Sequence, residues 1–204
     1  MISSDIVKSE RLSPFQKFLH QLSKLQSAEN FAKERHSVII RKDGIDHHEH
    51  LAGVVARLKN LGVTDEEVLA SAWLHDVIDD TDTSFEELDQ RFGSKVSVMV
   101  LSISKDRNLP RAKQEEQYVK QLKESTFDAK LIKLCDISAC LRDLKNSPIS
   151  KTKRVKEVKK KIFYLNVIKS DLVINKSKAP GINSLINGIN EMIIAYGLRP
   201  IIFQ

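Results

Sequence analysis

A histidine-aspartate pair followed closely by further carboxylates stands out in the segment WLHDVIDDTDT. His75 and Asp76 are adjacent, and Asp79 and Asp80 follow each of them by four residues. Residues four apart on a helix share a face, so we expect these side chains to project together. With Asp82, the segment carries four carboxylates between positions 76 and 82. Because like charges repel at such spacing, the cluster indicates a bound cation.

Further side chains suited to such a cation occur elsewhere in the sequence. The segment HHEH places histidines at positions 47, 48 and 50 just before an expected helix, and KLCD places Asp136 within a mainly apolar helix. Imidazole nitrogen and carboxylate oxygen together suit manganese, iron or zinc better than calcium or magnesium. An unpartnered carboxylate on an apolar helix is costly to bury, so Asp136 also needs a partner.

Each of these pieces has a simpler interpretation when it stands alone. An exposed histidine at a helix start would account for His50, an ordinary ion pair for Asp136, and a turn or helix-capping cluster for residues 79–82. A lone His-Asp pair is also a weak signal. The ordered combination of all the pieces is far more specific, and it favours a site for one divalent metal ion.

The elements that would position these residues are all predicted to be helical. Apolar residues recur at helical spacing, Gly62 and Gly93 are suited to end helices, and Thr64 with Glu67 is suited to begin one. No alternation with a period of two and no internal repeat occurs, so we predict an all-α fold. The predicted helices cover residues 13–31, 51–61 after the polar loop RKDGIDHH, 64–74 running into the acidic segment, 84–92, 94–103, 112–123, 126–145, 152–169 and 182–196.

Composition indicates a globular protein rather than a disordered or membrane-embedded one. Hydrophobic residues make up 41% of the 204 residues and charged residues 29%, and no apolar run is long enough for a spanning helix. The segment MISSDIVKSERLS lacks the apolar core of a signal peptide, which argues against secretion. Cys135 and Cys140 form neither a disulfide framework nor a CxxC motif. We therefore expect a cytoplasmic protein.

Basic residues are concentrated in the segment SKTKRVKEVKKK. The formal net charge is +6, and this segment contributes seven basic residues against the single acid Glu157. A solvated face of a C-terminal helix is the favoured interpretation, and a nucleic-acid contact is the alternative. Residues 146–150, which contain Pro148, form the best internal boundary. We expect residues 1–148 to form the catalytic domain and residues 149–204 a basic helical extension packed on it.

The order of the candidate ligands resembles the HD-domain superfamily, in which a histidine, a His-Asp pair and a distant aspartate all lie on helices. Within that superfamily, the chain is similar to the hydrolase domains of RelA/SpoT-type enzymes and to the small stand-alone alarmone hydrolases, which remove pyrophosphate from the 3′ position of (p)ppGpp. The resemblance covers about residues 30–146, through FAKERHSVIIRKDG, HLAGVVARL, ASAWLHDVIDDTDTSFEELDQRFGSKV, NLP and AKLIKLCDISACLRDL.

This resemblance implies an HD-type helical bundle with additional C-terminal helices, a metal-dependent phosphohydrolase activity and a nucleotide substrate. It implies Mn²⁺ as the cofactor, with no membrane or specific nucleic acid among the partners. The implied residues are His50, His75, Asp76 and Asp136 as metal ligands, Asp79 and Asp80 as the catalytic acidic pair, and Arg41, Lys42 and Arg142 in the nucleotide pocket.

Water attack on phosphorus is the chemistry expected of such a site, with the metal as Lewis acid. Asp80 is expected to act as general base and Asp79 to position the water, and the two roles are interchangeable at this stage. Arg41, Lys42 and Arg142 would hold the phosphates.

Four departures from the family pattern bear on the substrate. Asp79 replaces a glutamate, Cys140 an asparagine that contacts nucleotide, and Leu51 a proline, and the loop before His50 is about two residues short. Two alternatives therefore stay open. One is an HD-type phosphohydrolase of another nucleotide or phosphate ester, and the other is a nucleotide-binding module without hydrolysis.

Overall fold

The computed structural model describes residues 23–39 and 46–203 of the chain. Within these ranges the regular secondary structure is entirely helical, and no strand occurs. The predicted all-α class is confirmed. The helices are α3 (Lys24–His36), α4 (His47–Asn60), α5 (Glu66–Leu74), α6 (Val77–Asp80), α7 (Phe85–Phe92), α8 (Ser94–Ser102), α9 (Arg111–Glu124), α10 (Phe127–Asp143), α11 (Lys151–Ile174) and α12 (Ile182–Ala195), with a 3₁₀ turn at Lys176–Lys178.

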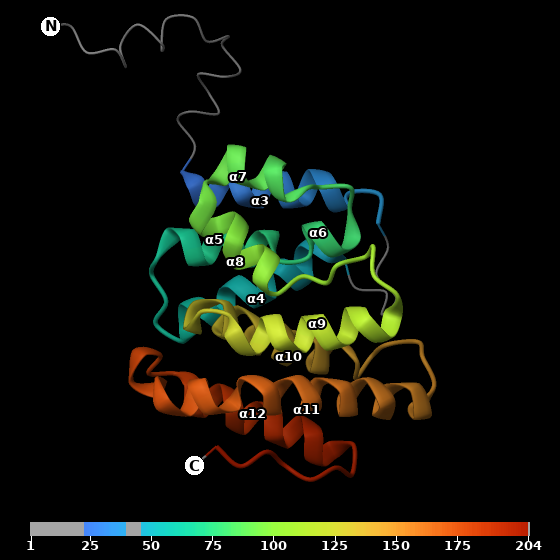
Figure 1. The fold of residues 1–204 in the computed structure, drawn as a ribbon. Helices are drawn as coiled ribbons and strands as arrows, with labels where there is room; N and C mark the ends of the chain where they lie inside the picture. Colours follow the sequence, from blue (N-terminus) through green and yellow to red (C-terminus); the bar gives the residue numbers. More distant parts are fainter. Residues whose placement is uncertain (1–22, 40–45, 204) are drawn as a thin grey trace, which may run out of the picture.

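The helices are stacked in layers around α10 (Figure 1). Helices α3 and α7 lie at one end of the molecule, α4, α5, α6 and α8 follow, and α11 and α12 close the other end. Helix α10 packs against α4, α5, α8, α11 and α12, and most of its side chains are buried. A polar residue on α10 is therefore placed in the interior unless it faces a cavity.

The start of α4 differs from the prediction in a way that affects the histidines. Asp46 caps this helix, because its side chain accepts hydrogen bonds from the backbone N–H groups of His48 and Glu49. The predicted loop through residues 47 and 48 was therefore wrong. His47, His48 and His50 lie in the first turn of α4 and take fixed directions from it.

The acidic segment is not one continuous helix. Helix α5 ends at Leu74, His75 is its C-cap, and the short α6 begins at Val77. The expectation that His75 and Asp79 share a helix face was wrong, since the helix is interrupted between them. Asp76 and Asp80 keep helical spacing, because the backbone N–H of Asp80 donates to the carbonyl of Asp76 at 2.9 Å.

Most other predicted helices are confirmed to within a few residues. Gly62 and Gly93 have φ values of 90° and 85°, as expected of helix-ending glycines. Asp65, rather than Thr64, caps α5, and its side chain accepts from the N–H of Glu67. The helix predicted over 152–169 extends to Ile174. Residues 13–22 of the first predicted helix lie outside the described residues.

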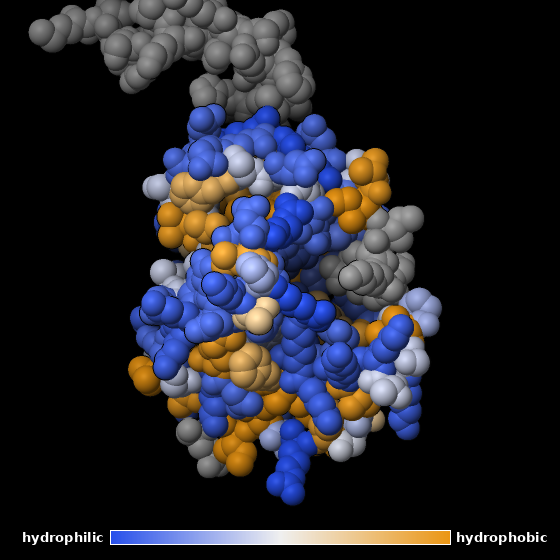
Figure 2. Space-filling view, turned by 45° about the vertical axis from the view of Figure 1, so that its right-hand side comes forward, coloured by the Kyte–Doolittle hydropathy of each residue, from blue (hydrophilic) through white to orange (hydrophobic). Residues whose placement is uncertain are grey.

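The surface is mainly hydrophilic. Figure 2 shows one face on which hydrophobic residues form small separate patches among charged and polar ones. Val38 and Ile174 are among the most exposed hydrophobic side chains. Among the described residues, no helix is long and apolar enough to cross a membrane.

The C-terminal helices are joined tightly to α4 at Gly181. A Cβ added at Gly181 would lie 2.5 Å from the carbonyl oxygen of Asn60, whereas one added at Gly188 would meet nothing within 4 Å. Gly181→Ala should therefore destabilise the protein by about 1–3 kcal/mol, because the backbone of α4 has to shift. Gly188→Ala, in the interior of α12, should instead stabilise it by about 0.5–1 kcal/mol.

Urea denaturation of the two variants and the parent protein measures these changes. Equal stability of Gly181→Ala and Gly188→Ala would show that the contact between α4 and α12 is looser than the structure has it.

Candidate metal centre

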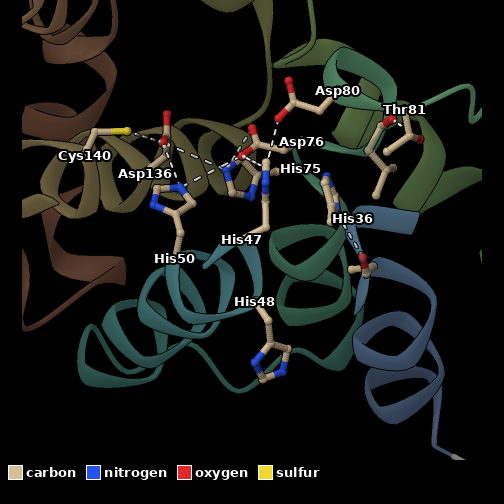
Figure 3. Close-up of polar contacts among 12 residues, drawn as sticks. His36, His47, His48, His50, His75, Asp76, Asp80, Thr81, Asp136 and Cys140 are labelled. Carbon is tan, nitrogen blue, oxygen red and sulfur yellow. Dashed lines mark hydrogen bonds and ion pairs between the residues drawn. The ribbon is translucent and has the colours of Figure 1, made fainter. Parts of the chain in front are cut away.

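Four of the predicted side chains meet at one place, although they come from separate elements (Figure 3). His50 lies on α4, His75 caps α5, Asp76 lies between α5 and α6, and Asp136 lies on α10. The Nε2 of His50 is 3.5 Å from Asp136 Oδ1 and 3.9 Å from Asp76 Oδ2. The Nε2 of His75 is 3.2 Å from Asp76 Oδ1 and 3.9 Å from Asp136 Oδ1.

The outer nitrogen of each histidine ring is held by a hydrogen-bond acceptor. The Nδ1–H of His75 donates to the carbonyl of Ala72 at 2.8 Å, and the Nδ1 of His50 lies 3.1 Å from Asp143 Oδ2. Both acceptors place the proton on Nδ1, so the lone pair is on Nε2 and faces the two carboxylates. Acceptors of this kind orient the histidines of metal sites in the same way.

The buried nitrogens of this cluster fit a divalent cation. His50 and His75 are almost fully buried, and neither Nε2 has a hydrogen-bond partner among the described residues. A buried lone pair without a donor is costly, and two of them beside two carboxylates are satisfied together by one positive ion. The donor set of two nitrogens and carboxylate oxygens suits a transition metal.

Asp136 is stabilised as an anion by two lysines. Burial opposes its charge, but the nearby positive charges of Lys133 and Lys161 hold its pKa well below the ordinary value. Lys133 Nζ lies 2.8 Å and Lys161 Nζ 3.9 Å from Asp136 Oδ2. The pKa of His75 is raised, because Asp76 and Asp136 together outweigh the effect of burial.

Asp79 and Asp80 lie beside this cluster and point in different directions. Asp79 Oδ1 accepts a hydrogen bond from the backbone N–H of Lys105 at 2.8 Å, and burial raises the pKa of Asp79 to about 6. Asp80 is more exposed, and its Oδ2 lies 3.0 Å from His47 Nε2. Only Asp79 of the two lines the cavity next to the cluster.

That cavity has a volume of about 230 Å³ and strongly mixed charge. Asp76, Asp79 and Asp136 lie on its acidic side, and lysines from three parts of the chain lie on the other. The lysines are Lys105, Lys133, Lys160 and Lys161, and the wall also contains Cys140, Glu157 and Tyr164. A cation on the acidic side would leave a cavity whose wall attracts phosphate.

The HD domain sequence model matches residues 28–165, which is more than half of the chain. The chain belongs to the HD domain family. Among curated relatives, the zebrafish guanosine-3′,5′-bis(diphosphate) 3′-pyrophosphohydrolase MESH1 is 42% identical over 118 residues, which cover 56% of this chain and 66% of the relative. Mouse MESH1 is 38% identical over 127 residues, covering 61% and 71%.

The chain therefore spans about two thirds of the length of these MESH1 relatives. Escherichia coli SpoT, a bifunctional (p)ppGpp synthase/hydrolase, is 31% identical over 141 residues, which cover 66% of this chain and 20% of SpoT. A solved structure of a metazoan SpoT ortholog that hydrolyses ppGpp aligns with a TM-score of 0.71 and 27% identity, covering 87% of this chain and 97% of the other. Relatives whose names state hydrolysis of (p)ppGpp thus align with most of the chain.

The lysine wall of this HD domain was not foreseen from the sequence. The basic segment of α11 was interpreted as a solvated face, which holds for exposed residues such as Lys153 and Lys156 but was wrong for Lys161, which is only partly exposed at the cavity. Lys160 is exposed, as interpreted, and also lines the cavity. The spacing of Lys161 from Tyr164, three residues further on and buried on the same helix, is the signal that places Lys161 toward the interior. Lys105 follows α8 and contacts both Glu115 and Tyr164.

Of the basic residues predicted for the nucleotide pocket, Arg142 is the one that lies among the described residues. Arg41 and Lys42 lie outside the described residues, and their role stays a prediction. Arg142 lies with Arg57 in a separate groove between α4, α10 and α12, and its Nε donates to Asp143. Asp143 thereby connects Arg142 with His50. The contact of Arg142 with a substrate also stays a prediction.

The pairing of Lys133 with Asp136 leads to a prediction on stability. Lys133→Met would remove the closer of the two lysines and leave the buried carboxylate with Lys161 at 3.9 Å, and breaking a buried pair costs about 3–5 kcal/mol. Added Mn²⁺ should recover much of this loss, because a divalent ion next to Asp136 replaces the missing charge. We expect the rise in Tm on adding Mn²⁺ to be larger for Lys133→Met than for the parent.

Lys130→Met is the matched control, since Lys130 is also a buried lysine on α10 but pairs with Asp171, away from the cluster. Its loss should lower Tm without enlarging the response to Mn²⁺. An equal response of the two variants would contradict the electrostatic role given to Lys133.

Proposed function

We propose that this HD domain hydrolyses (p)ppGpp and releases pyrophosphate from the 3′ position. The observation that carries the proposal is the meeting of His50, His75, Asp76 and Asp136 at the acidic side of a cavity walled by lysines. Relatives named as 3′-pyrophosphohydrolases of the same nucleotide are 37–42% identical. A site that combines a cation with a phosphate-attracting wall suits cleavage of a phosphoanhydride.

His50, His75, Asp76 and Asp136 are the proposed ligands of the metal ion. The mixed nitrogen and oxygen donors favour Mn²⁺, Fe²⁺ or Zn²⁺ over Ca²⁺ or Mg²⁺, and Mn²⁺ is the proposed ion. When bound, the metal would supply a Lewis acid and lower the pKa of a coordinated water. Asp143 and the Ala72 carbonyl keep the two histidines in the ligand tautomer.

The lysine wall is the proposed site for the phosphates of the substrate. Lys105, Lys160 and Lys161 reach the cavity from two separate parts of the chain, and Glu115 holds Lys105 in place at 2.5 Å. Lys133 and Lys161 already balance Asp136 and Lys105 pairs with Glu115, so Lys160 is the lysine whose charge is proposed to attract the substrate. Burial and the neighbouring Lys105 lower the pKa of Lys160, and the opposite effects of Glu115 and Glu157 are smaller in sum.

Asp79 and Asp80 are the proposed acidic pair, and their surroundings favour an exchange of the expected roles. Asp79 faces the cavity, and a carboxyl with a raised pKa is suited to accept and return protons near neutral pH. We assign proton transfer with the attacking water to Asp79. Asp80, held by His47, is assigned to position the water.

The presence of Cys140 leaves open which nucleotide is the substrate. Its thiol lines the cavity and donates to Asp136 Oδ1 at 3.1 Å, so it contacts the acidic side rather than offering an amide to a base. A panel of nucleotides and phosphate esters separates (p)ppGpp from other substrates. A binding module without hydrolysis is disfavoured by the complete set of proposed ligands. A cytoplasmic location is proposed because the sequence contains only two cysteines and no disulfide framework.

The decisive experiment is product analysis of the Mn²⁺-loaded protein with ppGpp. GDP and pyrophosphate in equal amounts are expected. Release of single phosphates, or turnover of other nucleotides alone, would contradict the proposed substrate. Intact ppGpp that stays bound to the protein would favour the binding module.

Removal of a proposed ligand should abolish tight metal binding at this centre. His75→Ala and Asp136→Ala each remove a donor that no neighbouring group replaces, so the affinity for Mn²⁺ should fall at least about 10–100-fold. Isothermal titration with MnCl₂ measures the change. His48→Ala is the control, because His48 lies on the same turn of α4 but contacts Glu29 and Trp73 instead. Unchanged affinity in the first two variants would refute the ligand assignment.

Loss of the Asp79 carboxylate should impair the reaction without emptying the metal centre. Asp79→Asn keeps the size of the side chain but removes its basicity, and general-base loss lowers rates by about 10²–10⁴-fold. In the parent, kcat/KM should fall as the pH drops below about 6, because Asp79 becomes protonated there. A cation bound near Asp79 lowers the pKa of its carboxyl group, so the fall in kcat/KM then occurs at lower pH.

Pyrophosphate release between pH 5 and 8 and bound manganese are measured on the same preparations. Full activity of Asp79→Asn would exclude Asp79 from proton transfer, and loss of manganese would reclassify it as a ligand.

A further inference from the structure

A second cluster of metal-ligating side chains lies next to the first. His36 is the last residue of α3, His47 the first residue of α4 and Asp80 the last residue of α6. One donor atom from each lies within 4.8 Å of the other two. Figure 3 shows the two imidazoles and the carboxylate grouped beside Asp76, on the side away from Asp136. Three separate elements thus bring two nitrogens and an oxygen together.

The histidines of this cluster carry unsatisfied buried nitrogens. His36 and His47 are 4% and 5% exposed, and neither His36 Nε2 nor His47 Nδ1 has a hydrogen-bond partner among the described residues. The Nδ1–H of His36 donates to the carbonyl of Ala32 at 2.8 Å, so its Nε2 carries a free lone pair. His36 thus shows the arrangement of the ligand histidines of the first cluster, whereas His47 directs its Nε2 to Asp80 and its Nδ1 has no partner among the described residues.

The packing of the two rings keeps their donor atoms close. The imidazoles of His36 and His47 are stacked, with centroids 4.1 Å apart and an angle of 20° between their planes. Metal–ligand bonds are about 2.0–2.2 Å, so donors of one ion lie within about 4.4 Å of each other, and the cluster needs only a small contraction.

Two carboxylates approach His47 at this place. His47 Nε2 lies 3.0 Å from Asp80 Oδ2 and 4.0 Å from Asp76 Oδ2. Asp76 Oδ2 is also 3.9 Å from His50 Nε2, so this carboxylate stands between the two clusters. Two imidazoles and two carboxylates form a ligand set for a divalent transition metal.

We propose that His36, His47 and Asp80 bind a second divalent cation, with Asp76 bridging it to the ion held by the first cluster. The centre would then hold two ions close together, as enzymes do that clamp the attacking and leaving oxygens of a phosphoryl transfer. The catalytic consequence rests on the proposed function, whereas the binding of the ion does not. Asp80 Oδ1 remains available to position water, because His47 contacts Oδ2.

Metal content tests this proposal without reference to activity. Equilibrium dialysis against MnCl₂, followed by elemental analysis, should give about two ions per chain for the parent. Asp80→Asn and His36→Phe should each reduce this to about one, since the first cluster is intact in both. Asp80 is largely exposed, so its variant should fold even if the buried His36 variant does not. His48→Phe, outside both clusters, should retain about two ions.

Electron paramagnetic resonance supplies a second readout, because two adjacent Mn²⁺ ions are magnetically coupled. The coupled signal should be present in the parent and in His48→Phe and lost in Asp80→Asn. One ion per chain in the parent, or two coupled ions in Asp80→Asn, would overturn the proposal. A parent with two coupled ions that leaves ppGpp intact would refute the proposed function and retain the second site. A parent protein that hydrolyses ppGpp with one bound ion would refute the second site and retain the proposed function.

Discussion

The burial of one carboxylate, Asp136, is the constraint on which the rest of the site depends. Its side chain is 6% exposed on the central helix α10, where an isolated charge would be strongly destabilising. Lys133 and Lys161 balance the charge from one side, and His50 and His75 approach from the other. The carboxylate therefore stays ionised in the interior, and this is the form that can bind a metal.

This constraint also makes the C-terminal helices part of the site. Lys161 reaches Asp136 from α11, and Lys160 and Tyr164 from the same helix line the cavity. The family match ends at residue 165, inside α11, so similarity extends over the part of α11 that faces the cavity. The division into residues 1–148 and 149–204 stays an interpretation, and the two parts share one cavity wall.

Residue types and order predicted the all-α class and a site for one divalent metal, and the resemblance to HD-domain proteins implied His50, His75, Asp76 and Asp136 as its ligands. Helical periodicity located most helices to within a few residues, because a buried stripe repeats at a spacing that is visible in the sequence. An aspartate on an apolar helix indicates a buried partner, since burial of its charge without a partner is too costly. The helix ends were less predictable, because they depend on single capping residues such as Asp46 and Asp65.

Tertiary structure alone decided which charged groups meet. The lysine wall joins residues that are up to 56 positions apart, and no local pattern records that Lys105 and Lys161 face one cavity. The break between α5 and α6 interrupts the helix on which His75 and Asp79 were predicted to share a face, and Asp79 faces this cavity while Asp80 contacts His47. Sequence spacing fixes directions only within a continuous helix. Between helices, side-chain direction is set by packing, and packing brought His36 and His47 into contact.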